Sequence, residues 1–495
     1  MRVGIIGAGV AGLATAKTLL QAGHEIVVYE SAPDVGGVWS RTRRYPGLTT
    51  QSAKATYGLS DYAMPRDFPE WPSGAQVQAW LAAYAVEFKV EPHLRLSTRV
   101  ERAERAGDRW TLMLSTGDVD TVDRLVVANG VFCEPQLPDL PGLASFQQAG
   151  GEVLAGTQVH DAEIARGKRV LVVGYGKSAC DVTVPLSTVA ASTHVIARQL
   201  LWKVPRKIAG VLNFKMLLLT RMGEALFRYH RLRGVEKFLH GPGNPVRRSM
   251  LDSLGSVSVR QYNLRRLGLV PRGTMEGIIK GAIGLCTEGF FEGVAAGTIV
   301  VRRDTTITRL LTRGGRPMAA LSDGTELPAD LVVCATGFRQ GVPFLDADTQ
   351  RRLFDERGNF RLYRQILPPD VEGLYFNGYN SSFFSPLNAE MAAVWITAHL
   401  AGAVPLPDPA AMCRQVEAQL AFMDTATDRH HCRGTKIIPF SLKNLDEVLD
   451  DLDLNIGRWG RAAQWLAPVD PSAYRAVTPA LVARLRARED AFENA

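Results

Sequence analysis

The 495-residue chain has few cysteines and no cysteine pair. Its six cysteines are scattered along the chain, and no two of them form a Cys-x-x-Cys motif. This distribution argues against a disulfide scaffold, a zinc site and a dithiol reductase, so no metal site is predicted. It also predicts a reducing, cytoplasmic environment.

Long hydrophobic runs are missing as well. No apolar stretch approaches the roughly 18 to 20 residues that a membrane-spanning helix needs. A strand is expected from Arg2 onward, which leaves no room for a signal or transit peptide. A content of 46% hydrophobic and 22% charged residues is typical of globular proteins. Because 495 residues exceed one ordinary core, two or three domains are expected.

Negative charge is scarce in one segment. Residues 198–250 contain twelve lysines and arginines but only Glu224 and Glu236, in a chain of net charge +7. No nucleic-acid recognition motif accompanies this segment, so nucleic-acid binding is disfavoured. Apolar residues alternate with basic ones at helical spacing within 205–270. This basic helical insertion either lies on a membrane surface through 205–240, covers a pocket, or forms an ordinary packed helix pair, which is the favoured interpretation.

Glycine, in contrast, is abundant and gathers in two fingerprints. The first is Gly7-x-Gly9-x-x-Gly12, placed between an apolar strand at 2–6 and a helix that begins at Val10. A helix that starts inside a glycine turn points its free amide groups at a phosphate. The motif and its context therefore predict a dinucleotide site.

The second fingerprint is Gly174-x-Gly176-Lys177-Ser178-Ala179, which follows an apolar strand at 169–173. Ala179 stands where a third glycine is usual. Alanine is tolerated at that position because only close packing of helix on strand is required there.

Charges of opposite sign follow the two fingerprints. Glu30 comes 23 residues after Gly7, and Arg198 comes 24 residues after Gly174. In such a unit this position faces the adenosine ribose. A carboxylate accepts hydrogen bonds from two free ribose hydroxyls, whereas a guanidinium suits a 2′-phosphate. The sequence thus predicts FAD in the first unit and NADPH in the second, unless Arg198 is only a surface residue.

Two further segments extend this pattern. In Gly36-Gly37-Val38-Trp39, Gly37 lets the backbone approach a ligand and Trp39 covers a flat ring, or else the segment is a turn with a core tryptophan. The ending Ala335-Thr336-Gly337 of an apolar strand resembles Ala128-Asn129-Gly130. This similarity predicts that the chain returns to the first sheet at 330–334.

The predicted fold is α/β, with two Rossmann-like dinucleotide-binding domains, the second inserted in the first, and a helical C-terminal extension. The first part of the FAD domain is expected at 1–155 and the NADPH domain at 156–325. The FAD domain is expected to resume at 326–404, and the C-terminal extension follows at 405–495.

Residues 1–400 resemble the flavin-containing monooxygenases. Both fingerprints with their charges, the Gly36–Trp39 segment and the turn at 335–338 carry the resemblance. The spacing Leu154-x-Gly156-x-x-x-His160 is similar to the family's linker signature, although Leu154 and Ile164 replace aromatic residues. The ending of the related Baeyer–Villiger signature is absent.

The resemblance implies that NADPH reduces FAD, that O2 adds to give a C4a-hydroperoxyflavin, and that a nucleophilic nitrogen or sulfur of a small molecule takes one oxygen. Gln51 stands where the family offers an asparagine to the flavin peroxide, so it is the catalytic candidate, unless it faces solvent. Asn388, at the start of a helix, is expected at the flavin's far edge. The residues expected to bind the cofactors are Gly7, Gly9, Gly12, Glu30, Gly37 and Trp39 for FAD, and Gly174, Gly176, Ser178 and Arg198 for NADPH.

Two alternatives remain open. The same fold supports Baeyer–Villiger oxygenation of a ketone, and it supports an NADPH oxidase or reductase that forms no stable peroxide. The sequence predicts neither the substrate nor the oligomeric state.

Overall fold

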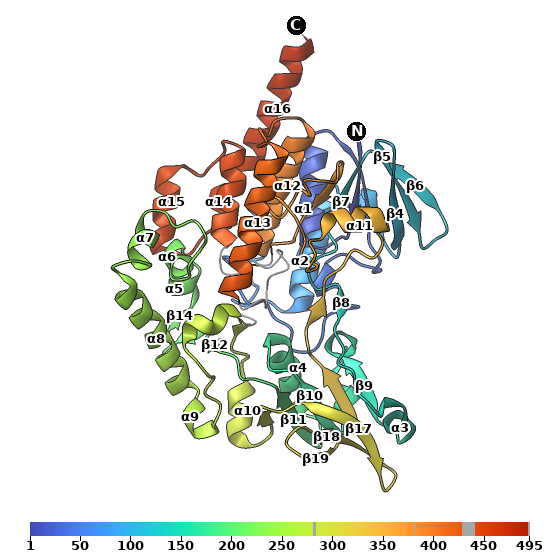
Figure 1. Cartoon of the computed structure of the whole chain (residues 1–495), viewed down its shortest axis with the longest axis vertical. Coiled ribbons are helices and arrows are strands. Elements are labelled where there is room, and N and C mark those ends of the chain that lie inside the picture. The colour runs from blue at the N-terminus through green and yellow to red at the C-terminus, as the bar shows by residue number, and fades with distance from the viewer. Residues whose placement is uncertain (281–283, 381, 428–440, 494–495) are drawn as a thin grey trace.

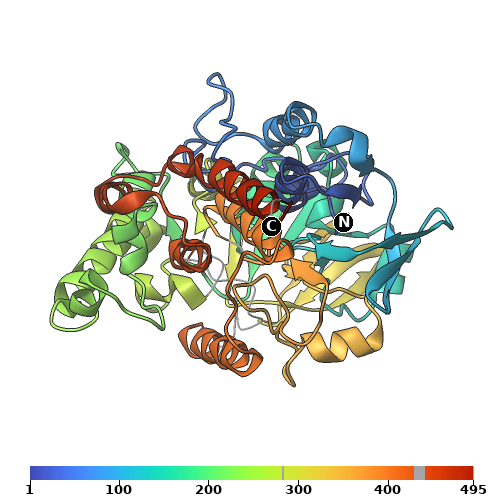
Figure 2. The same cartoon turned by 90° about the horizontal axis from the view of Figure 1, so that it is seen from above.

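Two parallel sheets organise the molecule (Figures 1 and 2). The computed structural model describes residues 1–280, 284–380, 382–427 and 441–493. The first sheet has the strand order β22-β7-β1-β2-β3, and every neighbouring pair is parallel. Its strands are β1 (Arg2–Ile6), β2 (Glu25–Tyr29), β3 (Leu94–Arg95), β7 (Arg124–Val127) and β22 (Leu374–Phe376). Helices α1 (Val10–Gln21), α2 (Gly74–Glu87) and α12 (Ser385–Leu400) belong to the same core cluster as its inner strands.

The second sheet has the same parallel design, with the order β16-β11-β10-β20-β9. The strands are β9 (Glu152–Ala155), β10 (Arg169–Val173), β11 (Ser192–Ala197), β16 (Val300–Arg303) and β20 (Leu331–Cys334), and the packed helices are α4 (Lys177–Ser187) and α10 (Phe290–Ala296). Each unit also carries a three-stranded antiparallel sheet: β4 (Val100–Ala106), β5 (Arg109–Leu114) and β6 (Val119–Val122) in the first, and β17 (Ile307–Arg313), β18 (Arg316–Leu321) and β19 (Glu326–Pro328) in the second.

The chain passes between the two units twice, at adjacent places. The outgoing strand β8 (Glu134–Pro135) pairs antiparallel with the returning strand β21 (Phe338–Arg339). The second unit is therefore inserted in the first, as predicted. Because β9 pairs in the second sheet, the crossing lies near 135 rather than at the expected boundary of 155.

The prediction that the strand at 330–334 returns to the first sheet is wrong. This strand, β20, pairs with β10 in the second sheet. The similarity of its ending to residues 128–130 has another cause. A Cβ on Gly7 would lie 2.5 Å from the carbonyl oxygen of Ala128, and a Cβ on Gly174 would lie 2.6 Å from that of Ala335. The two endings thus occupy equivalent positions in two sheets, each against the first glycine of its own fingerprint.

The basic insertion packs against two of the C-terminal helices, α14 (Ser441–Asp451) and α15 (Gly457–Leu466). The Arg221 guanidinium donates to both carboxylate oxygens of Asp446 at 2.5 and 2.8 Å. The insertion contains α5 (Lys215–Leu218), α6 (Arg221–Ala225), α7 (Val235–Leu239), α8 (Asn244–Gln261), α9 (Leu264–Leu267) and the short strands β13 (Lys207–Ile208) and β14 (Leu212–Asn213), and it is flanked by the paired short strands β12 (Lys203–Val204) and β15 (Gly284–Leu285). The extension contains α13 (Pro409–Ala426), α14, α15 and α16 (Val477–Glu493), and α3 (Leu143–Gln148) and α11 (Ala347–Leu353) lie on the connections. Figure 1 shows α14 and α15 beside α5, α6 and α7.

None of the helices in the described part of the chain is long and apolar enough to cross a membrane. Leu219, Leu226 and Phe227 of the insertion are buried in the protein core. The favoured interpretation of this segment, packed helices, agrees with their burial. Peripheral membrane contact through 205–240 stays a prediction.

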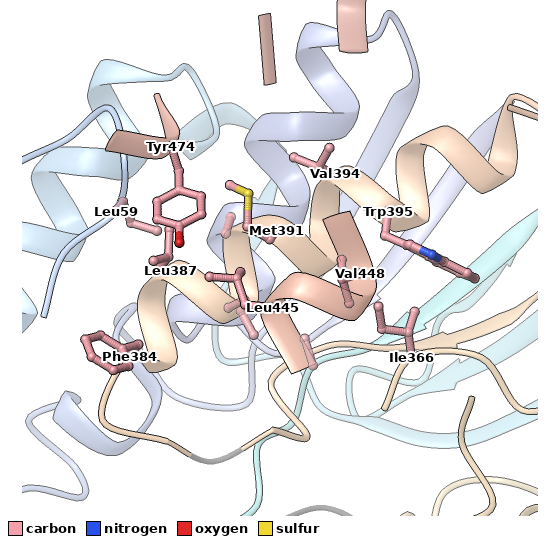
Figure 3. Close-up of a cluster of buried hydrophobic side chains, with 14 of the residues drawn as sticks. Leu59, Ile366, Phe384, Leu387, Met391, Val394, Trp395, Leu445, Val448 and Tyr474 are labelled. Atoms are coloured by element: carbon pink, nitrogen blue, oxygen red, sulfur yellow. The ribbon is translucent and has the colours of Figure 1, made fainter. Parts of the chain in front are cut away.

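Helix α12 runs through the centre of the main core. Figure 3 shows Leu387, Met391 and Val394 of α12 among the apolar side chains of this core, with Leu445 and Val448 of α14 beside them. Most residues of α12 are apolar and buried, which is typical of a helix in the core of a large protein.

A buried ion cluster joins α12 to α1. The Lys17 ammonium is fully buried, donates to Glu390 Oε1 at 3.3 Å and also contacts Asp61. Ser60 completes the cluster, since its backbone N–H donates to Glu390 Oε2 at 2.7 Å. Burial raises the pKa of the Glu390 carboxyl, and the Lys17 ammonium opposes this shift. The cluster fixes the distance between the two helices.

We expect Lys17→Met to lower the free energy of unfolding by about 3–5 kcal/mol, because it leaves a buried carboxylate without its counter-ion. The control is Lys168→Met, which breaks only the exposed pair of Lys168 with Glu152 and should cost ~0–1 kcal/mol. Thermal and urea unfolding measure both. Equal effects of the two substitutions would contradict a structural role for the cluster.

Candidate cofactor site

One large cavity reaches the first glycine turn and the start of the helix that follows the second turn. Gly7, Gly9 and Glu30 line it from the first unit, and Lys177 and Ser178 line it from the second, whereas Gly174 and Gly176 do not line it. Its volume is about 1100 Å³, whereas pockets for single drug-sized ligands measure roughly 300–1,000 Å³. The cavity is therefore large enough for a ligand of dinucleotide size.

The first glycine turn has no space for side chains. A Cβ on Gly12 would lie 1.8 Å from the carbonyl oxygen of Gly7, which itself has a φ of +107°. A Cβ on Gly37, at a φ of +60°, would lie 3.2 Å from the Gly9 Cα. The 7–12 turn and the segment at Gly37 thus meet at the start of α1, where the first amide groups of the helix have no partners within the helix. This cradle fits the pyrophosphate of a dinucleotide.

Glu30 lies at the end of β2, inside the cavity. Its carboxylate accepts hydrogen bonds from the backbone N–H groups of Ala8 and Ala32, both at 2.8 Å. The side chain is almost fully buried. Its Oε1 atom also accepts from the Ser31 hydroxyl at 3.3 Å. These bonds fix its orientation, and Oε2 keeps a second lone pair for a hydroxyl donor.

Trp39 forms part of the cavity wall together with Tyr57. Its Nε1–H donates to the Tyr57 hydroxyl at 3.3 Å, and the rings meet edge to face with centroids 6.0 Å apart. Trp39 also packs in the main core. Both sequence interpretations of this tryptophan, core residue and ring cover, are therefore compatible with its position.

The second glycine turn is looser than the first. Gly174 has a φ of +126°, but a Cβ on Gly176 would meet nothing within 4 Å. Ala179 is buried, so the wider helix–strand spacing here accommodates its methyl group. The Tyr45 hydroxyl donates to Ser178 Oγ at 2.8 Å, which joins the first unit to the second at the cavity wall.

Gln51 lies in the cavity wall. Its Oε1 atom is buried and has no hydrogen-bond partner, so this oxygen does not face solvent. A buried polar atom without a partner costs free energy unless a ligand supplies one. The neighbouring Ser52 hydroxyl donates to the Phe383 carbonyl oxygen at 2.6 Å and holds this segment against the start of α12.

Arg198 and Asn388 do not line the cavity in this structure. Arg198 is exposed directly after β11. The Asn388 side chain donates to the Phe384 carbonyl oxygen at 3.1 Å and accepts from Asn380 Nδ2 at 2.9 Å. Asn380 itself lines the cavity, and its Oδ1 atom is buried without a partner. The amide that meets the cavity is thus that of Asn380.

Several lining residues escaped the sequence analysis. Tyr45, Tyr57 and Asn380 lie in irregular segments, where no periodic pattern marks them. The pairing of Lys177 with Asp181 could have been predicted from the sequence, because two residues of opposite charge four positions apart lie on the same face of a helix. Their side chains form a buried ion pair, and burial lowers the pKa of the Lys177 ammonium. Among the residues that the structure describes, no cluster of histidine, cysteine or carboxylate side chains suits a metal ion.

Comparison with known proteins also indicates a flavin-binding protein. Residues 1–237 match the family model described as flavin-binding monooxygenase-like. The chain is 28% identical over 424 residues to 4-hydroxybenzoate brominase (decarboxylating) of Marinomonas mediterranea, covering 82% of this chain and 75% of that protein. It is 25% identical over 480 residues to dimethylaniline monooxygenase [N-oxide-forming] 2 of Oryctolagus cuniculus, covering 92% and 82%.

Residues 1–237 belong to the flavin-binding monooxygenase-like family, and the chain is similar to flavin-containing monooxygenases over most of its length. It is an FAD-dependent monooxygenase that uses NADPH. The fold agrees, since the open crystal structure of cyclohexanone monooxygenase superposes with a TM-score of 0.66 at 18% identity, covering 91% of this chain and 97% of the other. The relatives of this monooxygenase carry names of different reactions, so family membership does not fix the substrate.

Gly12→Ala should abolish FAD retention, because the added Cβ would collide with the Gly7 carbonyl group. The reverse change at the equivalent position, Ala179→Gly, should keep FAD and cost about 1 kcal/mol of stability, the usual helix penalty of glycine. The ratio of flavin to protein absorbance after purification measures retention. A Gly12→Ala protein that keeps its full flavin content would contradict the proposal that this glycine turn binds FAD.

Proposed function

We propose that this monooxygenase inserts one atom of O2 into a small molecule at a nucleophilic nitrogen or sulfur. The observation that carries the proposal is one cavity that is lined by the first glycine turn, by the start of α4 after the second turn, and by Gln51, whose Oε1 atom is buried without a partner. Bound FAD supplies the redox chemistry, since it accepts a hydride from NADPH and in its reduced form reacts with O2.

The residues of the cavity bind and orient these groups. In this proposal Gly7, Gly9 and Gly12 take the FAD pyrophosphate and Glu30 takes its ribose hydroxyls. Gly37 allows close approach, and Trp39 shields the ligand from water. In the second unit, Gly174, Gly176 and Ser178 receive the NADPH pyrophosphate. Arg198, at the end of β11, is free to turn toward the 2′-phosphate because its side chain is exposed.

Gln51 is the residue proposed to contact the reacting centre. Its buried Oε1 atom, which has no partner in the protein, accepts a hydrogen bond in a site where water is excluded, and such bonds are stronger there than in water. The lining side chains on its own segment (Leu48, Thr49, Ser52) and on the segment bonded to it (Asn380, Ser382, Phe383) are uncharged. An uncharged wall favours transfer of oxygen to a neutral nucleophile over stabilisation of an anionic attacking group.

One observation favours the Baeyer–Villiger alternative. The Arg206 guanidinium donates to the Thr49 hydroxyl at 2.8 Å, and its Nε is buried without a partner. A cation bonded to Thr49, which stands two residues before Gln51, would stabilise the anionic peroxide that attacks a ketone. Arg206 is not part of the cavity lining, and this alternative is therefore the second candidate.

A panel of probes decides between the two reactions. We expect the purified enzyme with NADPH to convert a thioether to its sulfoxide and a tertiary amine to its N-oxide, and to leave cyclohexanone unchanged. Mass spectrometry with 18O2 measures the incorporated oxygen. Lactone formation at a comparable rate would favour the alternative, and hydrogen peroxide as the sole product would overturn both.

Gln51→Leu should uncouple NADPH oxidation from product formation, because it removes the amide and keeps the volume of the wall. The amount of product per NADPH should fall at least tenfold, with the excess appearing as hydrogen peroxide. In Gln51→Asn, which keeps an amide on a shorter side chain, the amount of product per NADPH should fall less. A coupling ratio equal to that of the parent in Gln51→Leu would refute the proposed contact.

Arg198→Ala should raise the KM for NADPH at least tenfold and change the KM for NADH little, because only NADPH carries the 2′-phosphate. Arg166→Ala, which removes an exposed arginine paired with Glu163, is the control and should change neither KM. An equal effect of Arg198→Ala on both coenzymes would contradict the assignment.

A further inference from the structure

Three buried asparagine side chains form a hydrogen-bonded group at the edge of the cofactor cavity. Asn380 lines the cavity, whereas Asn388 and Asn444 do not. The Asn380 Nδ2 atom donates to Asn388 Oδ1 at 2.9 Å and to Asn444 Oδ1 at 2.8 Å. Both N–H bonds of this amide are therefore used by residues outside the cavity lining, and neither is left for a ligand.

The amide of Asn388 can hold only one orientation. Its Nδ2 atom donates to the Phe384 carbonyl oxygen at 3.1 Å, and a carbonyl oxygen can only accept. The Asn388 Oδ1 atom must therefore face Asn380, which in turn must present its Nδ2 atom. This leaves the Asn380 Oδ1 atom as an acceptor, and it is buried without a partner. A buried acceptor without a donor costs free energy until a ligand supplies one.

Asn388 also orients a second cavity residue, Ser382. The Asn388 Nδ2 atom donates to Ser382 Oγ at 3.3 Å, and the Phe384 backbone N–H donates to the same oxygen at 3.0 Å. The Ser382 hydroxyl proton must therefore point elsewhere, and no oxygen in the described part of the chain accepts it. Because Ser382 and Asn380 both line the cavity and both contact the Asn388 amide, the wall presents a donor beside an acceptor.

Asn444 connects the C-terminal extension to this wall. It belongs to α14, which lies beside α12 (Figures 1 and 2). Arg364 holds α14 in place, since its guanidinium donates to the two carboxylate oxygens of Asp451 at 2.8 and 2.9 Å. The Arg364 carbonyl oxygen accepts from Asn444 Nδ2 at 3.4 Å, which directs Asn444 Oδ1 at Asn380. A residue of the extension thus orients an amide of the cofactor cavity.

We propose that Asn380 Oδ1 and the Ser382 hydroxyl bind an amide edge of a cofactor, in which an N–H stands beside a C=O. Asn380 accepts from the N–H, and Ser382 donates to the C=O. Asn388 and Asn444 are positioning residues, because they determine which atom of Asn380 meets the ligand. The pyrimidine ring of the flavin and the carboxamide of the nicotinamide both carry this edge. A site built around such a hydrogen bond rejects a ligand that lacks the partner group.

Two cofactor analogues that lack the N–H test the acceptor and distinguish the two cofactors. 3-Methyl-FAD carries a methyl group on flavin N3, and 3-acetylpyridine NADP+ carries a methyl group in place of the amide nitrogen, while both keep the C=O. Titration calorimetry measures FAD and 3-methyl-FAD on the full chain after its flavin is removed, and NADP+ and its analogue on the holoenzyme. We expect at least one analogue to bind about tenfold or more weakly than its natural cofactor, the loss for one buried hydrogen bond. Equal Kd values within both pairs would overturn the proposal.

Variants of the asparagines separate recognition from a steric effect of the methyl group. In Asn380→Ala, which removes the acceptor and leaves room for a methyl group, the Kd of the analogue divided by that of the cofactor should fall to about one. Asn388→Leu and Asn444→Leu should each lower this ratio about threefold or more, whereas Asn444→Asp, which keeps an oxygen toward Asn380, should retain it. The control is Asn359→Ala, which removes a buried amide that bonds Asp355 and should leave the ratio unchanged.

The ratio distinguishes positioning from a structural role, because a loosened fold weakens both ligands of a pair alike. The parental ratio in Asn380→Ala would contradict the acceptor, and the parental ratio in both leucine variants would contradict the positioning roles. If a variant does not fold, the two analogues on the parent protein keep the test decisive. All titrations use oxidised cofactors without substrate, so a failure of the proposed oxygenation would leave their outcome unchanged.

Discussion

The ion cluster of Lys17 with Asp61 and Glu390 is the constraint on which the cavity geometry depends. Lys17 belongs to α1 and Glu390 to α12, and both of these side chains are fully buried. The start of each helix opens on the cofactor cavity, α1 through Val10 and Ala11, and α12 through Ser385 and Ala389. A buried charge pair is stable only when its partners keep their positions, so it fixes the register of the two helices. The cluster thus holds the first glycine cradle and the opposite end of the cavity at a set distance.

The two fingerprints could be predicted from sequence because they depend on local backbone geometry. Gly7, Gly12 and Gly174 occupy positions where a Cβ would collide with a carbonyl oxygen, and such constraints leave a readable spacing. The place of β20 could not be read in the same way. Its ending resembles that of β7 because both meet a first glycine, and local similarity does not say to which sheet a strand belongs.

The side chains around the reacting centre were less predictable, since they come from irregular segments brought together by tertiary packing. Gln51 was found only through family resemblance, and Asn380 was missed although its amide faces the cavity where Asn388 was expected. The basic residues of the insertion are evident from the sequence, whereas the burial of its apolar residues, such as Leu219 and Phe227, depends on tertiary packing.

The proposed function requires that FAD and NADPH meet in one cavity of a single chain. Anaerobic stopped-flow mixing of the purified holoenzyme with NADPH tests it most directly. We expect complete bleaching of the flavin absorbance near 450 nm in a first-order process, and its rate constant should saturate as the NADPH concentration rises. Flavin that stays oxidised, or that is reduced only when a second protein is added, would contradict it.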